Sequence, residues 1–312
     1  MDSRSIGVQR QHTLTGHRNC VYALLGSPGG EDVFSADGNG SVVRWRLGEP
    51  DKGYLVAQLP RSVYAMAYEP QSHQLLIGQN FEGLHEVDWQ RKVEIRSLRL
   101  TDAAIFDMLA IGEHLWVALG DGSLAVVHLP SWSVVHRLSL SNRSARTLAY
   151  HPGRNELLVG YSDHFIRVVD AQTGALRQEW RAHANSVFTL AFSPDYSLLL
   201  SGGRDARLRA WNPGANYHPG VELVAHLFAL NHIVFSPDGQ FFVTCSMDKS
   251  IKVWSANEAR LLKVIDKSRH AGHGTSVNRL LWLPATQQFI SAGDDCTLAV
   301  WKFSLQPETT TN

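Results

Sequence analysis

The sequence contains little cysteine, no excess of charge and no long hydrophobic run. Its 312 residues include only three cysteines, Cys20, Cys245 and Cys296. Because these lie far apart in the chain, they predict buried structural thiols rather than a disulfide framework or a pair of metal ligands. The 29 basic residues balance the 29 acidic ones, so the molecule as a whole has no field that would attract nucleic acid or an anionic membrane.

Targeting segments are missing as well. No stretch approaches the roughly 18 apolar residues that a membrane-spanning helix needs. The N-terminus does not combine a basic segment with an apolar one, as a secretory signal would. The sequence therefore predicts a cytoplasmic protein with no membrane partner, and we expect it to be a monomer on its own.

Four residue types recur at a fixed spacing and define an internal repeat. In three copies a histidine is followed after 18, 22 and 28 residues by serine or threonine, aspartate and tryptophan. The complete sets are His183, Ser201, Asp205 and Trp211; His226, Thr244, Asp248 and Trp254; and His273, Ser291, Asp295 and Trp301. An earlier copy has His17, Ser35 and Trp45 but places Asn39 where the aspartate is expected. A period of about 42 residues indicates one supersecondary unit repeated along the chain.

Each repeat predicts four short antiparallel strands, which make one blade of a propeller. Residues 187–192 alternate apolar and polar side chains and end in a Ser-Pro-Asp turn, and residues 198–201 follow as a second strand. Fainter copies fill the interval between the clear ones. The fold class is therefore all-β, a seven-bladed propeller with four antiparallel strands per blade.

The repeats predict one domain over residues 8–303. The blades are expected to start near residues 17, 59, 100, 141, 183, 226 and 273. The chain after Trp301 is too short for a fourth strand and a tail, whereas residues 8–14 stand where a fourth strand should be. We therefore expect the N-terminal strand to complete blade 7 and close the ring, with flexible tails at 1–7 and 304–312.

These motifs resemble the WD40 repeat family. The resemblance rests on Gly16-His17, the Ser-Pro-Asp turns at 193 and 236, Ser201-Gly202-Gly203-Arg204-Asp205 and the run 250–254 ending in Trp254. It is clear in blades 1 and 5–7 and faint in blades 2–4, and no blade keeps the family's Trp-Asp dipeptide. It implies a rigid platform for other proteins. It indicates the fold more specifically than the function, because one propeller serves many unrelated tasks.

Serine, histidine and aspartate also occur in hydrolytic triads, but the pattern here favours structure over catalysis. A nucleophile is needed once, whereas this set appears three times, each time with a tryptophan whose only polar atom is an N–H donor. We expect a chain of hydrogen bonds from indole to hydroxyl to imidazole to carboxylate, and no enzyme activity. Blade 2 replaces the whole set by apolar residues, and blade 4 keeps only Asp163, which is expected to form a turn. The aligned residues in blade 2 are Leu59, Ile77, Phe81 and Val87.

No cofactor or metal is expected. His270 and His273 are three residues apart but lack a third ligand nearby, and no Asp-Gly turn is followed by the glutamate of a calcium loop. Nucleotide-binding glycine motifs are missing too. The arginines at 177, 181, 207 and 209 predict a solvated outer face rather than a phosphate track.

The resemblance places two positions of each repeat on the top face, where a partner would bind. Five residues after the tetrad histidine, the sequence reads Tyr22, Tyr64, Phe106, Arg146, Phe188, Asn231 and Asn278. Directly before the turn aspartate, the candidates are Arg204, Met247 and Asp294. Large aromatic residues and arginine dominate the energetics of interfaces.

The sequence thus predicts a non-catalytic scaffold that binds proteins or peptides through this top face. A partner with an apolar anchor next to an acidic group would suit it. A phosphopeptide or nucleic-acid reader using Arg146 and Arg204 is the first alternative, although nucleic acid is not favoured by the balanced charge. An enzyme with its site in the central channel is the second alternative, but Asp294 is the single acid among these positions.

Overall fold

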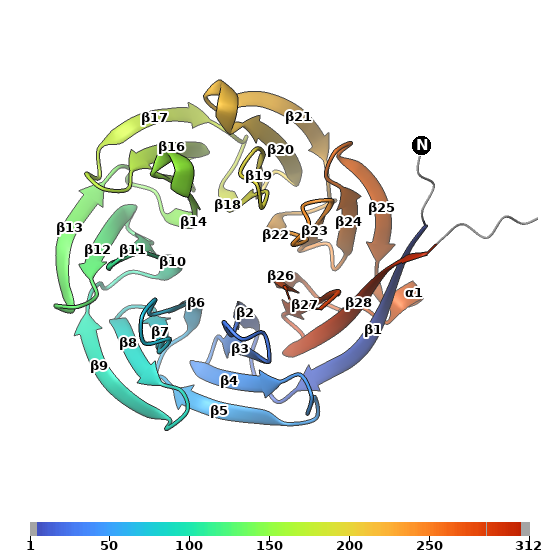
Figure 1. Cartoon of the computed structure of the whole chain (residues 1–312), viewed down its shortest axis with the longest axis horizontal. Coiled ribbons are helices and arrows are strands. Elements are labelled where there is room, and N and C mark those ends of the chain that lie inside the picture. Colours follow the sequence, from blue (N-terminus) through green and yellow to red (C-terminus); the bar gives the residue numbers. More distant parts are fainter. Residues whose placement is uncertain (1–4, 285, 307–312) are drawn as a thin grey trace, which may run out of the picture.

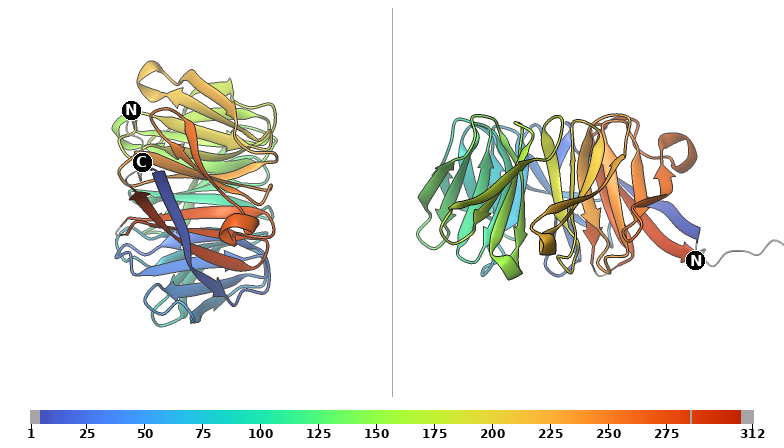
Figure 2. Two further views of the ribbon diagram at one scale, coloured as in Figure 1. Left: turned by 90° about the vertical axis from the view of Figure 1, so that its right-hand side faces the viewer. Right: turned by 90° about the horizontal axis from the view of Figure 1, so that it is seen from above.

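Seven four-stranded antiparallel sheets form a closed ring around a central axis (Figure 1). The computed structural model describes residues 5–284 and 286–306. Seen from the side, the ring is a short disc with loops on two opposite faces (Figure 2). The prediction of an all-β, seven-bladed propeller is confirmed.

Each blade has a first, second, third and outer strand, counted from the axis outward (Figure 1). The first strands are β2 (Val21–Gly26), β6 (Val63–Tyr68), β10 (Ile105–Ile111), β14 (Ala145–His151), β18 (Val187–Phe192), β22 (Leu230–Phe235) and β26 (Val277–Leu283). The second strands are β3 (Asp32–Asp37), β7 (Leu75–Gln79), β11 (His114–Leu119), β15 (Glu156–Tyr161), β19 (Leu199–Gly203), β23 (Phe241–Ser246) and β27 (Gln288–Gly293). First strands begin four or five residues after the predicted blade starts.

The remaining strands complete the blades. The third strands are β4 (Ser41–Arg46), β8 (Gly83–Asp88), β12 (Ser123–His128), β16 (Phe165–Asp170), β20 (Arg207–Asn212), β24 (Ile251–Ser255) and β28 (Thr297–Gln306). The outer strands are β5 (Gly53–Gln58), β9 (Val93–Arg99), β13 (Ser133–Ser139), β17 (Leu176–Arg181), β21 (His218–Val224), β25 (Arg260–Ile265) and β1 (Ser5–Thr15). The described residues also include two 3-10 turns, η1 (Pro152–Arg154) and η2 (Pro213–Ala215), and one α-helical turn, α1 (Lys267–His270), which lies outside the ring beside blade 7 (Figure 1).

Strand β1 closes the ring by pairing with β28 of blade 7. The pairing runs from Ser5 opposite Gln306 to Thr15 opposite Thr297. The predicted tail boundaries were therefore wrong at both ends, because residues 5–7 and 304–306 pair as strands and satisfy each other's backbone groups. The other residues assigned to the tails, 1–4 and 307–312, lie outside the described residues.

The hydrophobic core consists of seven clusters, and each cluster joins two neighbouring blades. One cluster unites Phe34 of blade 1 with Leu75 of blade 2, and another unites Val21 of blade 1 with Ile290 of blade 7 across the closing junction. A blade therefore buries its apolar faces only when both neighbours are present. The core sits between the blades and leaves the axis free for other side chains.

The histidine–aspartate sets form hydrogen-bonded tetrads within blades 5, 6 and 7. In blade 5 the Trp211 indole N–H donates to the Ser201 hydroxyl (2.9 Å), which lies 2.8 Å from His183 Nε2. His183 Nδ1 lies 2.9 Å from the Asp205 carboxylate, which also accepts the Ala184 backbone N–H. Blades 6 and 7 repeat this geometry around His226 and His273. The tetrad ties the loop before the first strand to the second and third strands.

Blade 1 has a complete tetrad, but its carboxylate comes from Asp37 rather than from the Asn39 position. His17 Nδ1 lies 2.8 Å from Asp37, His17 Nε2 lies 2.6 Å from Ser35 Oγ, and Trp45 Nε1 donates to Ser35 (2.7 Å). Asp37 is two residues after Ser35 on one strand, so strand alternation places both side chains on the same face. Asn39 instead accepts a hydrogen bond from Asn19 at the exposed turn.

Blades 2 and 4 replace the tetrad in different ways. Leu59, Ile77 and Val87 pack together in the cluster between blades 1 and 2, whereas Phe81 is 53% exposed at a left-handed turn. In blade 4, Asp163 is more than a turn former, because it accepts hydrogen bonds from Ser141 (2.6 Å) and Arg167 (2.8 Å). Ser141 occupies the place of the tetrad histidine.

Removing strand β1 should destabilise the ring. Deleting residues 1–15 exposes the edge of β28 and the closing cluster, so we expect the melting temperature to fall by many degrees in differential scanning calorimetry. Deleting residues 1–4, which leaves the paired strand intact, is the control. An unchanged melt in the longer deletion would contradict closure by β1.

The assignment of Asp37 to the tetrad can be tested by substitution. Asp37→Ala leaves buried His17 without its acceptor and should lower the free energy of unfolding by about 1 to 3 kcal/mol. Asp205→Ala should have a similar cost, and Asn39→Ala a much smaller one. Urea denaturation followed by tryptophan fluorescence measures all three, and equal effects of the Asp37 and Asn39 variants would refute the assignment.

The tetrads should also make stability fall on acidification. Burial lowers the pKa of His17, His183 and His226 below 6.5, and the neighbouring carboxylates offset this only in part. Burial raises the pKa of Asp295, but bonds from His273 and Thr297 outweigh it and hold that pKa at about 2. As the pH falls below the ordinary pKa of histidine, and later below that of aspartate, the unfolded chain binds more protons than the native one. Urea midpoints should therefore drop from pH 7.5 to pH 5.5 and again below about pH 4, and a flat profile would contradict this.

Candidate functional site

A β-bulge near the start of each first strand directs one side chain toward the axis. In all seven blades, the pairing of the first and second strands skips the second residue of the first strand. A bulge leaves this residue unpaired and re-aims its side chain. The skipped residues are Tyr22, Tyr64, Phe106, Arg146, Phe188, Asn231 and Asn278, which are the seven candidates of the first set.

These seven side chains line one cavity of about 360 Å³, which we call the axial pocket. Arg279 is its eighth lining residue and was not predicted. The pocket lies toward the face that carries the loops before the first strands and the turns between the second and third strands. Backbone bonds such as Gly38 N–H to Cys20 C=O (3.0 Å) and Asp294 N–H to Ser276 C=O (2.9 Å) join these segments. We call this face the top face.

Aromatic rings cover one half of the axial pocket in a continuous arc. Tyr22 meets Tyr64 edge to face with ring centroids 4.9 Å apart, and Tyr64 stacks on Phe106 at 6.0 Å. The Arg146 guanidinium then lies over Phe106 at 3.8 Å and over Phe188 at 4.9 Å. Four aromatic rings and one cation thus form a preorganised wall.

The other half of the pocket is polar and is held by bonds between blades. Asn231 donates to the Val277 carbonyl (2.8 Å) of the next blade. Asn278 donates to the Val21 carbonyl (3.1 Å) and to the Asp294 carboxylate (2.7 Å), and so bridges blades 7 and 1. These amides are fixed in place by the ring, and the face they present to the pocket is polar.

Two guanidinium groups give the axial pocket its charge. Burial lowers the pKa of Arg146 to about 10, with Arg279 and Arg204 adding repulsion, so Arg146 is still a cation at neutral pH. Arg279 donates through Nε to the Tyr22 carbonyl (3.1 Å). Within the part of the chain that the structure describes, neither guanidinium forms an ion pair with a carboxylate. The pocket therefore favours an anionic group.

A second layer of side chains lies one residue further along the first strands and was missed by the sequence analysis. Asp107 accepts the Leu148 N–H (2.8 Å), Thr189 the Ile233 N–H (3.2 Å) and His232 the Leu280 N–H (3.3 Å), each from the following blade. Burial raises the pKa of Asp107 and lowers that of His232 well below its usual value. These groups connect the blades beneath the pocket. They could have been found from the sequence, because each directly follows one of the seven residues that line the axial pocket.

The second predicted set does not line the axial pocket. Arg204, Met247 and Asp294 lie on the surrounding rim of the top face, where their backbone N–H groups bind the loops before the first strands. The Asp294 carboxylate is occupied by Asn278, whereas Met247 is 57% exposed beside Leu227 (83%) and Phe228 (61%). The rim of blade 6 thus carries a group of exposed apolar side chains.

Unpaired arginines gather on the top face. Arg18, Arg61 and Arg143 lie exposed in the loops before the first strands of blades 1, 2 and 4, and Arg204 is exposed at the turn of blade 5. None of the four has an ion-pair partner among the described residues. Arginines in strands are largely neutralised, as when Arg44 of β4 binds Asp32 (2.6 Å) and Arg167 of β16 binds Asp163 (2.8 Å). These four arginines therefore add unpaired positive charge to the top rim.

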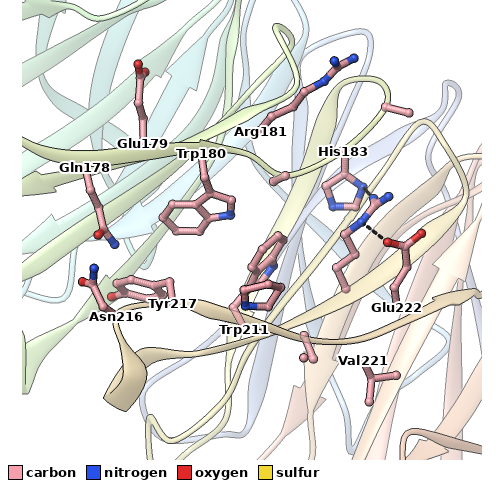
Figure 3. Close-up of a pocket in the computed structure, with 16 residues that line it drawn as sticks. Gln178, Glu179, Trp180, Arg181, His183, Trp211, Asn216, Tyr217, Val221 and Glu222 are labelled. Atoms are coloured by element: carbon pink, nitrogen blue, oxygen red, sulfur yellow. Dashed lines mark hydrogen bonds and ion pairs between the residues drawn. The ribbon is translucent and has the colours of Figure 1, made fainter.

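A larger cavity of about 640 Å³ lies on the outer side of the ring between blades 4 and 5 (Figure 3). Trp180 of β17 stacks on Tyr217 with centroids 5.3 Å apart and tilts against Trp211 of β20. Pro219 and Gly220 of β21, neither of which has a long side chain, are among the residues that line it. Because outer strands of two blades form it, no single repeat predicted it.

The outer arginines near this cavity are mostly paired. Arg207 and Arg209 bind Glu222 at 2.6 and 3.0 Å, and Arg177 binds Asp170 and Glu156. Arg209 also bonds Asp205 (3.0 Å) and has a largely buried side chain, so it belongs to the tetrad of blade 5 rather than to a solvated face. Paired guanidiniums offer little to a phosphate chain.

Within residues 5–284 and 286–306, no group of three or more histidine, cysteine, aspartate or glutamate side chains is arranged to hold a metal ion. The same residues include no helix of sufficient length and apolarity to cross a membrane. The tetrad hydroxyls of Ser35, Ser201 and Ser291 are fully buried. A buried hydroxyl that already accepts an indole N–H is not placed to attack a substrate.

Comparison with known proteins defines the class. The family model described as WD domain, G-beta repeat matches residues 8–46, 174–212, 218–255 and 266–302. Together with the seven-bladed ring, these four repeats make the chain a WD40-repeat β-propeller. The matches fall on blades 1 and 5–7, where the tetrads are complete.

Similar curated proteins cover parts of the chain. Nuclear distribution protein PAC1 of Arthroderma benhamiae is 26% identical over 192 residues, which are 58% of this chain and 41% of that protein. Polyadenylation factor subunit 2 of Candida albicans is 28% identical over 145 residues, 46% of this chain and 25% of that protein. Transducin beta-like protein 3 of Bos taurus is 28% identical over 198 residues, 61% of this chain and 23% of that protein. The matched segment spans about two fifths or less of these relatives, and none of their names denotes an enzyme.

Proposed function

We propose that this protein is a non-catalytic scaffold that binds partner proteins through its top face, with the axial pocket as the centre of the contact. The observation that carries the proposal is the convergence of seven bulge residues, one from each blade, on one cavity with two unpaired guanidiniums. None of these side chains belongs to a cluster of the interblade core. Side chains that the core does not use are available to a partner.

The lining of the pocket defines the chemistry of the partner. An apolar side chain would pack against Tyr22, Tyr64 and Phe106, and an adjacent carboxylate would pair with Arg146 or Arg279. At about 360 Å³ the cavity accommodates one or two side chains rather than a folded segment. An anchor of this kind is typical of an interface hot spot.

The rim extends the contact around this anchor. Arg18, Arg61, Arg143 and Arg204 favour acidic residues of the partner, and the exposed group of Leu227, Phe228 and Met247 offers apolar contact on blade 6. Charged residues on the rim should mainly raise the association rate, and this contribution should weaken with salt. The predicted cytoplasmic location and monomeric state of the free protein stay predictions from the sequence.

A reader of phosphorylated peptides is a second candidate, favoured by the same two guanidiniums. A phosphate would offer more acceptors to Arg146 and Arg279 than a carboxylate does. The half of the pocket formed by Tyr22, Tyr64 and Phe106 argues for the carboxylate partner with an apolar anchor instead, because a phosphate site has no need of this aromatic arc.

The proposal can be tested by selecting peptides from a random displayed library on the wild-type protein. We expect enriched peptides to combine an aromatic or aliphatic residue with a neighbouring aspartate or glutamate. Tyr64→Ala and Arg146→Glu should each weaken their binding at least tenfold in isothermal titration, with unchanged melting temperature. Arg91→Glu on the opposite face, where Arg91 is 84% exposed, is the matched control and should bind as wild type.

Other results would indicate a different binding surface or a different kind of ligand. Selected peptides that bind both pocket variants as well as wild type would place the contact elsewhere on the ring. Loss of binding after phosphatase treatment of phosphopeptides, with no affinity for their glutamate counterparts, would support the phosphate reader. Binding of a single-stranded oligonucleotide that collapses between 50 and 200 mM salt would support a nucleic-acid reader.

A further inference from the structure

Two cysteines that are far apart in the sequence meet at the junction between the first and last blades. Cys20 Sγ and Cys296 Sγ each lie 3.8 Å from the same acceptor, the backbone carbonyl oxygen of Asp294. The two sulfur atoms are therefore separated by at most twice that distance. The expectation that all three cysteines are buried structural thiols was wrong for Cys20 and Cys296, which are partly exposed, whereas Cys245 is fully buried.

The backbone around both thiols is held by the fold. Cys20 directly precedes β2, and its carbonyl accepts the Gly38 N–H (3.0 Å). Cys296 lies in the turn between β27 and β28 with a φ of 62°. Asn278 bonds both segments, because it donates to the Val21 carbonyl (3.1 Å) and to the Asp294 carboxylate (2.7 Å). These bonds hold the segments that carry Cys20 and Cys296 next to each other.

Both thiols can be reached from the top face. Cys20 and Cys296 are partly exposed, in contrast to Cys245. Burial raises the pKa of each thiol, and the neighbouring carboxylates Asp294 and Asp295 raise it further. The pair therefore lacks the activation of a catalytic cysteine, and it should oxidise slowly. A thiol of raised pKa is also a poor leaving group, so a disulfide formed here should resist reduction once made.

We propose that Cys20 and Cys296 form an intramolecular disulfide under oxidising conditions and so staple blade 1 to blade 7. With oxidised glutathione as the oxidant, one cysteine thiolate attacks a glutathione sulfur and releases the first glutathione thiolate. The second cysteine thiolate then attacks the protein sulfur of the mixed disulfide and releases the second. The protein loses two electrons and two protons, and oxidised glutathione becomes two molecules of reduced glutathione.

The proposed disulfide would lie at the one junction of the ring that joins distant parts of the chain. The other six blades are each built from four consecutive strands, whereas blade 7 takes its outer strand, β1, from the opposite end of the chain. A disulfide here closes a loop of nearly the whole chain, and long loops gain the most from cross-linking in the chain-entropy description. Cys20 is two residues from Tyr22, so oxidation also fixes the edge of the axial pocket next to this residue.

The test uses the purified full chain, reduced and then incubated with excess oxidised glutathione. Free thiols are blocked with iodoacetamide before digestion and mass spectrometry. We expect a cross-linked peptide that joins Cys20 to Cys296, faster migration on a non-reducing gel and a melting temperature several degrees higher. Dithiothreitol should reverse all three changes, and Cys245 should react with iodoacetamide only after unfolding.

Single variants separate this disulfide from other oxidation products. Cys20→Ser and Cys296→Ser should each prevent the gel shift and the rise in melting temperature, whereas Cys245→Ser should retain both. Glutathione bound separately to Cys20 and Cys296, a cross-link between two molecules, or no reaction after prolonged oxidation would each overturn the proposal. Cys20→Ser and Cys296→Ser change partly exposed side chains, so their reduced forms should melt close to wild type. Cys245→Ser places a hydroxyl in an apolar cluster and should melt lower, so each oxidised variant is compared with its own reduced form.

Discussion

Burial of apolar surface between neighbouring blades is the constraint on which the whole structure depends. Each of the seven core clusters draws its side chains from two sheets, so a blade alone has no core of its own. The last junction cannot be made by chain continuity, and strand β1 therefore crosses to blade 7 and pairs with β28. Closure removes the open sheet faces that an incomplete array would present.

The tetrads act within this frame as rigid links and not as reactive groups. Each one binds the loop before a first strand to the second and third strands of the same blade, through donors and acceptors that are matched in number. Blade 2 loses all the polar members together and fills the space with Leu59, Ile77 and Val87. Replacement of a complete polar set by apolar side chains is tolerated, because no buried group is left without a partner.

The same bulge in every blade gives the axis its chemistry. The bulge fixes the direction of the side chain, while the residue type varies freely from blade to blade, since the core does not depend on it. In this chain the result is an aromatic arc beside Arg146 and Arg279. A regular scaffold thereby presents an irregular surface, and irregularity is what allows one propeller to distinguish partners.

Much of the molecule could be predicted from the sequence, because the repeat is local. The spacing of His183, Ser201, Asp205 and Trp211 lies within one blade, so it predicted the strand order and the blade number. The resemblance to the WD40 family then placed the seven residues that line the axial pocket on the top face. The tetrad of blade 1 was expected to lack its aspartate, because Asn39 stands at that offset, but Asp37 at the end of β3 binds His17 instead. That difference is a matter of strand alternation and turn shape, which the offset alone does not record.

Contacts between blades were decided by the tertiary structure. Asp107, His232 and Arg279 reach backbone groups of the following blade, the cavity beside Trp180 needs two outer strands, and Cys20 meets Cys296 only when the ring closes. A repeat pattern describes one unit, whereas these features depend on the distance and angle between units. The sequence by itself determined that there are seven similar blades, and the packing of each blade against the next determined which distant side chains meet.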